Sequence, residues 1–172
     1  MANSINISLI NGINQEVSSD VDILNIEGQG YGRVYLKDRT SDLTINMNNI
    51  KFGTDENGGY LDLSGETQGE ININVIGESV INAGKVSLDY VPDDGVVVNA
   101  AIRIPNGVIT TITCGKGNSL TCIGETLVYK EGVTPEYKAG AGIGGSNGDT
   151  CGTITVNCEG EIKSIGGVSA AG

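Results

Sequence analysis

The stretch EININVIGESVINA, residues 70–83, alternates apolar and polar side chains, pauses at a glycine and then alternates again. A period of two is the pattern of a β-strand that has one face in a core. On this pattern Ile71, Ile73 and Val75 point inward, and the asparagines between them point outward. The stretch therefore predicts two short strands joined at a corner.

Three further segments repeat this pattern of strand, polar or glycine corner and second strand: LTINMNNIKF (43–52), TTITCGKGNSLTCIG (110–124) and GTITVNCEGEIKSIGG (152–167). Aligning Ile45, Ile73, Ile112 and Ile154 gives steps of 28, 39 and 42 residues. We expect the longer steps to span more than one coil. Few two-residue hairpin signals separate strands of equal length, so the repeat favours a solenoid, in which parallel strands of successive coils stack.

The composition agrees with this interpretation. Isoleucine (21) and valine (15) far outnumber leucine (9), and branching at the β-carbon favours strands over helices. No stretch places apolar residues at helical spacing for three turns. At 20 to 30 residues per coil, the sequence predicts an all-β, right-handed parallel β-helix (a β-solenoid) of about seven coils. We expect it to occupy residues 21–172, with residues 1–20 as an N-terminal strand, cap or subunit-connecting segment.

One family resemblance supports this fold. The run AGAGIGG (139–145), followed by CGTITVN (151–157) and EIKSIGG (161–167), resembles the GAGIGG/GTITI repeat of bacterial surface proteins with right-handed parallel β-helices. The resemblance covers residues 70–172 and implies an adhesin-like or carbohydrate-binding protein at the cell surface or outside the cell. The sequence departs from the family in carrying a single AGAGIGG and in ending at VSAAG, where the repeat would begin again.

The glycine run at 139–145 has two interpretations. A phosphate-binding loop is followed by a helix and usually by a lysine next to a serine or threonine. Here a strand pattern follows instead. The run is therefore interpreted as a tight corner of the solenoid.

Charge and missing residue types exclude several functions. The net charge of −11 and the lack of Lys/Arg clusters argue against binding nucleic acid. The sequence contains no apolar span long enough to predict a membrane crossing. No secretory signal is recognised either, so the sequence does not indicate a route of export. The chain has no histidine, and the acidic pair Asp93-Asp94 is interpreted as part of a proline-initiated turn rather than a hydrolase acid pair. We expect no enzymatic activity and no cofactor.

Weaker signals suggest two kinds of ligand. Asp55 and Asp149 lie in polar loops that suit calcium, although neither loop has the remaining features of a known calcium motif. Sugars bind aromatic faces, and Tyr31 with Tyr35, or Tyr129 with Tyr137, could form a small platform. The alternative is that these tyrosines are core-edge or corner residues.

The four cysteines are Cys114, Cys122, Cys151 and Cys158. Their spacing does not match zinc sites, and no histidine could complete one. Cys114 and Cys158 follow the aligned isoleucines, so in adjacent coils they would lie within disulfide range. Buried free thiols are the alternative.

These observations predict a structural subunit that stacks head to tail with itself into an extracellular fibre or surface appendage. Stacking is expected because the terminal coils of a solenoid expose unpaired strand edges. The residues expected to mediate assembly are Ile5, Ile7, Leu9, Val168 and Ala170. The alternative is a cell-surface adhesin or carbohydrate-binding module with surface glycans as partners.

Overall fold

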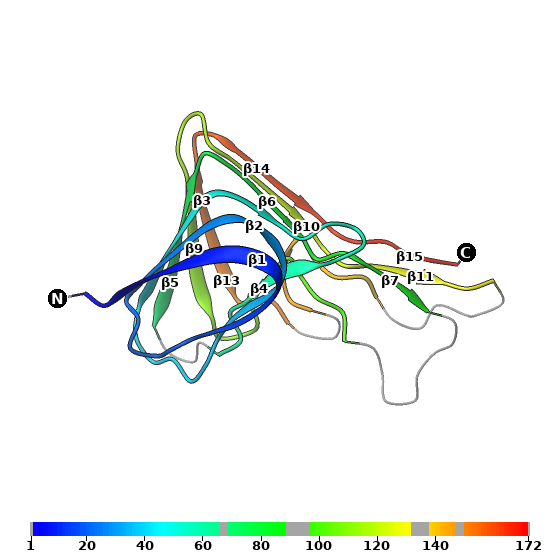
Figure 1. The fold of residues 1–172 in the computed structure, drawn as a ribbon, viewed down its shortest axis with the longest axis horizontal. Helices are drawn as coiled ribbons and strands as arrows, with labels where there is room; N and C mark the ends of the chain where they lie inside the picture. Colours follow the sequence, from blue (N-terminus) through cyan, green and yellow to red (C-terminus); the bar gives the residue numbers. More distant parts are fainter. Residues whose placement is uncertain (1, 66–68, 89–96, 132–137, 147–149, 172) are drawn as a thin grey trace.

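The computed structural model describes residues 2–65, 69–88, 97–131, 138–146 and 150–171. Within these residues the protein consists of strands and turns without helices, and every pairing between its named strands is parallel. The strands stack on one another and form a curled sheet (Figure 1). The predicted all-β class and parallel arrangement are therefore confirmed.

The strands run along the chain in the following order: β1 (Ser4–Val17), β2 (Ile23–Leu36), β3 (Leu43–Phe52), β4 (Gly59–Asp62), β5 (Glu70–Ile76), β6 (Glu78–Asn82), β7 (Lys85–Leu88), β8 (Ile102–Arg103), β9 (Ile109–Cys114), β10 (Ser119–Ile123), β11 (Thr126–Tyr129), β12 (Ile143–Gly144), β13 (Thr153–Cys158), β14 (Glu161–Ile165) and β15 (Ser169–Ala171).

The main ladder stacks six strands in the order β1, β2, β3, β5, β9 and β13. We call a set of residues that lie opposite one another on successive strands a rung. One rung whose side chains point inward consists of Ile5, Leu24, Ile45, Ile73, Ile112 and Val156. The predicted alignment of Ile45, Ile73 and Ile112 is confirmed. The alignment of Ile154 was wrong, because Ile154 lies opposite Thr110. A shift of two residues leaves every side chain on the same face, so alternation alone could not detect it.

The steps between rungs lengthen along the chain, from 19 residues between Ile5 and Leu24 to 44 between Ile112 and Val156. The 39-residue step from Ile73 to Ile112 joins neighbouring strands of the ladder, so the expectation that such steps span several coils was wrong. The longer coils carry additional strands outside this ladder, such as β7 and β11. The predicted count of about seven coils is not confirmed.

Two more ladders turn the sheet around the core. After β2 bends, its second half pairs with β4, and β8 and β12 follow in register. Between these two sides, β3 pairs with β6, and β10 and β14 continue that stack. A separate three-stranded sheet, β7–β11–β15, extends to one side in Figure 1.

The interior is apolar and continuous across the coils. Leu24, Ile45, Ile71, Ile73 and Val75 are buried in one core cluster that extends from β1 to β10. The inward orientation predicted for residues 71, 73 and 75 is therefore confirmed. The first strand, β1, pairs with β2 along nearly its whole length and so belongs to the same sheet. The predicted role of residues 1–20 as a cap or connecting segment stays a prediction.

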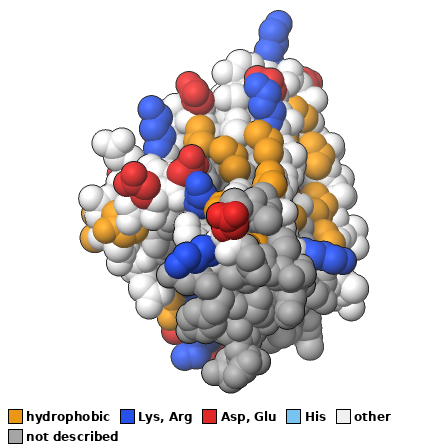
Figure 2. Space-filling view, turned by 90° about the vertical axis from the view of Figure 1, so that its right-hand side faces the viewer, with side chains coloured by type: hydrophobic (Ala, Val, Ile, Leu, Met, Phe, Trp, Pro, Cys, Tyr) orange, Lys and Arg blue, Asp and Glu red, His pale blue; other side chains and the backbone are white. Residues whose placement is uncertain are grey.

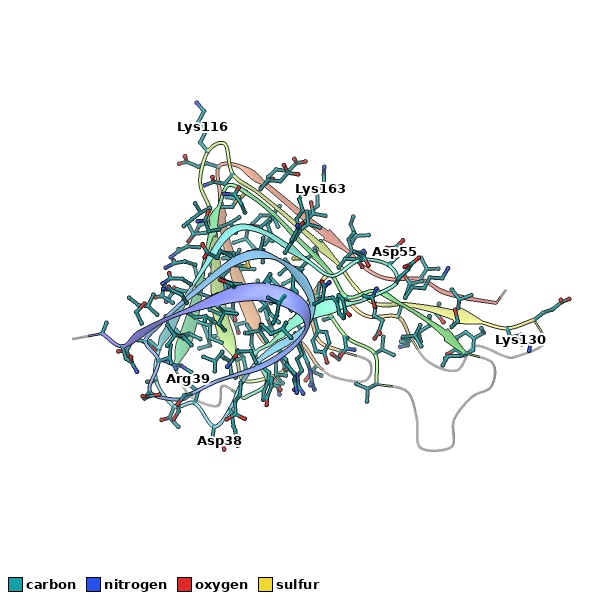
Figure 3. All side chains as sticks on the ribbon, viewed as in Figure 1. Asp38, Arg39, Asp55, Lys116, Lys130 and Lys163 are labelled. Carbon is teal, nitrogen blue, oxygen red and sulfur yellow. The ribbon has the colours of Figure 1, made fainter. Side chains whose placement is uncertain are left out.

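Arg39 is fully buried in the loop between β2 and β3 (Figure 3). Its guanidinium donates to the carbonyl oxygens of Ser41 at 2.9 Å and Asp42 at 2.6 Å. It also reaches the carbonyl oxygens of Ser18 and Ser19, both at 3.4 Å, in the preceding loop. A buried cation requires such partners, so Arg39 ties two successive corner loops together.

Candidate functional site

The two edges of the main ladder are the first candidate site. In the described residues, β1 pairs only with β2, and β13 pairs only with β9. Each strand therefore has one backbone edge without a neighbouring strand, which is a template for pairing with another strand. Of the predicted assembly residues on β1, Ile7 and Leu9 are buried and Ile5 is half-buried, all in the core.

The edge at β13 and β14 is more open than the edge at β1. Val156 occupies an inward rung and is 50% exposed, and Ile165 on β14 is 46% exposed. Ile154 and Ile162 are half-buried and pack against the core. Sequence reasoning missed these four residues as candidates for assembly. The inward pattern could have identified Ile154, Val156 and Ile162, whereas Ile165 lies opposite Ile123 on the outer face.

The remaining predicted assembly residues lie near the side sheet. Val168 is 59% exposed just before β15. Ala170 is opposite Val128 in the β15–β11 pair, and its side chain lies outside the described residues. On the side of the molecule that carries this sheet, Figure 2 shows hydrophobic side chains gathered beside basic and acidic ones.

The outer face of the main ladder carries a row of amides. Asn25 donates to Asn6 at 2.9 Å, Asn46 donates to Asn25 at 2.8 Å, and Asn74 donates to Asn46 at 2.9 Å. The next two strands hold Thr113, which interrupts the amides, and then Asn157 at the same outer position. Stacked amides of this kind add side-chain hydrogen bonds between neighbouring parallel strands.

Replacing Asn46 by alanine should therefore lower the free energy of unfolding by about 1–2 kcal/mol, because it removes two side-chain hydrogen bonds in the middle of the row. Asn14→Ala is the matched control, since Asn14 is an exposed asparagine on β1. Urea denaturation measures both variants. Equal stabilities for the two variants would show that the row contributes nothing.

A buried carboxylate links three coils. The Oδ2 atom of Asp62 on β4 lies 2.6 Å from Nη2 of Arg33 on β2 and 3.5 Å from Nη1 of Arg103 on β8. Its other oxygen accepts the backbone N–H of Ser64 at 3.0 Å. Burial alone would raise the pKa of Asp62, but these hydrogen bonds and the Arg103 charge together lower it. Sequence reasoning missed this cluster, because the register that joins residues 33, 62 and 103 is not visible in the sequence.

A second buried carboxylate stands beside the glycine run. Glu125 accepts hydrogen bonds from the backbone and side-chain nitrogens of Asn99 at 2.7 and 3.1 Å. Burial raises its pKa, and the Asn99 bonds partly oppose that effect. A Cβ atom added at Gly140 would collide with the carbonyl oxygen of Asn99. This close approach of neighbouring coils explains the glycine. The strand β12, residues 143 and 144, lies within the run 139–145, so that part of the run is a ladder strand and not a corner.

The cysteines divide into a pair and two separate thiols. Cys114 on β9 lies directly opposite Cys158 on β13. Cys114 and Cys122 are buried, whereas Cys151 and Cys158 are exposed, and all four are free thiols in the structure.

The three candidate tyrosines within the described residues have different surroundings. Tyr31 lines a hollow of about 330 Å³ together with Asn11, Gln29, Lys51 and Thr54. The guanidinium carbon of Arg33 lies 4.3 Å from the centroid of the Tyr35 ring. The hydroxyl group of Tyr35 donates a hydrogen bond to the carboxylate of Glu16. Tyr129 is fully buried, which fits the core-edge alternative. Tyr137 lies outside the described residues.

Of the two calcium candidates, Asp55 is the one that lies in the described residues. Asp55 accepts a hydrogen bond from Asn82 at 2.8 Å, and Figure 3 shows it far from the loop of Asp38 and Arg39. Within the described residues, no group of three or more histidine, cysteine, aspartate or glutamate side chains could hold a metal ion. Asp149 and the pair Asp93-Asp94 lie outside those residues.

Comparison with known proteins gives no relative: no family model, curated protein or solved structure matches this chain. None of the described residues form a helix long and apolar enough to cross a membrane. The site and its function therefore rest on the geometry described above.

Proposed function

We propose that the protein is a non-enzymatic structural subunit, a right-handed β-solenoid that stacks end to end into an extracellular fibre or surface appendage. The observation that carries the proposal is the identity of pattern at the two edges. On β1 the segment SINI, residues 4–7, alternates between side chains that point outward and side chains that point inward, beginning with outward Ser4. On β13 the segment TVNC, residues 155–158, alternates in the same way, beginning with outward Thr155. The strands between them repeat the pattern, so the two edges are equivalent to interior coils.

This pattern defines a register for the contact. If Val156 lies opposite Ile5 of the next subunit, the inward rung continues across the junction. Asn157 then faces Asn6 of the next subunit, which pairs two amides at the outer position where Asn6, Asn25, Asn46 and Asn74 form the row. The half-exposed side chain of Val156 and the half-buried side chain of Ile162, both at inward positions, lose their contact with water at the same junction. Such a head-to-tail contact generates an open filament when the rotation between subunits does not close a ring.

Sedimentation velocity tests the proposal with a double variant, Val156→Glu plus Ile162→Glu, which changes one inward residue on β13 and one on β14. Wild-type protein should form species that grow with concentration, and the double variant should remain monomeric because each new carboxylate would have to enter a dry contact without a partner. Val97→Glu is the control, since Val97 is 81% exposed and lies outside β13 and β14. Growth of the double variant equal to that of wild type would contradict the proposed contact.

The Tyr31 hollow favours a second candidate, a cell-surface adhesin or carbohydrate-binding module. An aromatic ring beside amide and hydroxyl side chains is a combination that suits a sugar. A wild-type protein that stays monomeric at all concentrations and is retained on a polysaccharide gel would favour this candidate over stacking.

A further inference from the structure

Cys114 and Cys158 have the backbone relationship of a disulfide. They are directly opposite each other on the parallel strands β9 and β13. Neighbouring strands lie about 4.8 Å apart. This spacing falls within the Cα separation of disulfides, about 4.4–6.8 Å. Both residues occupy the inward rung that also contains Val75, so their side chains extend from the same face.

The pair is also accessible from one side. Cys158 is exposed, and Cys114 lies beneath it with its sulfur 3.6 Å from the carbonyl oxygen of Glu161. Thr113, Gly115, Asn157 and Glu159 complete a hollow of about 500 Å³ around the two cysteines. Burial raises the pKa of the Cys114 thiol, so the exposed Cys158 is the thiol that reacts first.

The other two cysteines lack such a partner. Cys122 on β10 is buried between Ile81 and Ser164 of the neighbouring strands. Cys151 is exposed in a loop, where it pairs with Pro105 through an isolated antiparallel bridge. Among the described strand pairs, the only cysteines that face each other are therefore Cys114 and Cys158.

We propose that Cys114 and Cys158 form a disulfide that fastens β13 to β9, by exchange with a dissolved low-molecular-weight disulfide. The Cys158 thiolate attacks one sulfur of that disulfide and releases the other half as a thiol, which leaves a mixed disulfide on Cys158. Cys114, after losing its proton, attacks the Cys158 sulfur and displaces the second thiol. Two protein thiols are thereby oxidised by two electrons, and one small disulfide is reduced to two thiols.

Both sulfurs belong to one subunit, so the inference does not require stacking. In the proposed stacking register Cys158 would face Ile7 of the next subunit, so the inference is tested on protein dilute enough to remain monomeric. Its test incubates the native, reduced protein with oxidised glutathione, blocks remaining thiols with iodoacetamide and analyses mass and peptides without reduction. The expected product has a peptide containing Cys114 linked to one containing Cys158, while Cys122 is alkylated only after unfolding. Cys151→Ser should give the same link at the same rate.

Two variants keep the experiment interpretable. In Cys114→Ser, the exchange should stop at a stable glutathione adduct on Cys158, and in Cys158→Ser the link and the adduct at this position should both be lost. The wild-type result alone can overturn the proposal. A lasting glutathione adduct on Cys158 with Cys114 still free, or a link from Cys158 to Cys151, would contradict it.

Discussion

Replacing Ile73 by aspartate is expected to abolish folding. Ile73 is fully buried at the centre of the main ladder, between Ile45 and Ile112 in one inward rung. An unpaired carboxylate there would cost several kcal/mol, and the lost apolar contacts would add about 2–3 kcal/mol. Domains of this size are stable by only about 5–15 kcal/mol, so the sum removes most or all of the stability. Far-ultraviolet circular dichroism should show loss of the β-sheet signal.

Ile76→Asp is the matched control, because Ile76 stands on the same strand and is 46% exposed on the outer side. It should fold cooperatively and unfold within a few degrees of wild type. A soluble Ile73→Asp variant with a cooperative transition would mean that the inward register of β5 is wrong.

Replacing Asp62 by alanine is expected to have the second largest effect, a loss of about 3 kcal/mol in the free energy of unfolding. Removing one partner of a buried ion pair costs about 3–5 kcal/mol. The lower end applies because the Arg33 and Arg103 side chains remain 38% and 28% exposed and can recover some hydration. The backbone N–H of Ser64 also loses its acceptor. Urea denaturation at neutral pH measures the loss.

The effect of Asp62 should depend on pH in a defined direction. Because the folded-state pKa of Asp62 is lowered, its contribution is present above the unfolded-state pKa of about 3.9 and is lost as the pH falls through the folded-state value. Wild type and Asp62→Ala should therefore converge in stability as the pH falls below about 4. Glu27→Ala, at an exposed carboxylate on β2, should differ little from wild type. A gap between wild type and Asp62→Ala that is constant from neutral pH to acid would contradict this assignment.

The fold could be predicted because strand alternation and the polar outer positions recur in every coil. The inward orientation of Ile71, Ile73 and Val75 followed from alternation alone. The exact register did not, as the placement of Ile154 shows, since shifts by two residues preserve the faces. The length of each coil could not be predicted either, because β7 and β11 have the same strand pattern as the main ladder but pair in a separate sheet.

Prediction of the site was less complete. The proximity of Cys114 and Cys158 was predicted from a register that is off by two residues. Aligning Ile112 with Ile154 would place Cys114 opposite Val156, whereas the register in the structure places Cys114 opposite Cys158. The Arg33–Asp62–Arg103 cluster was not predicted, because it joins residues about 30 and 40 positions apart whose local sequences carry no shared motif. The burial of Arg39 was equally invisible, as its partners are backbone carbonyl groups.

Electron microscopy of the wild-type protein at high concentration tests the stacking of coils across subunits most directly. We expect filaments, under both oxidising and reducing conditions, in which β13 of one subunit lies beside β1 of the next in the register that places Val156 opposite Ile5. Monodisperse single particles under both conditions would contradict this account. So would filaments that join subunits through the β7–β11–β15 sheet and leave the edges of β1 and β13 free.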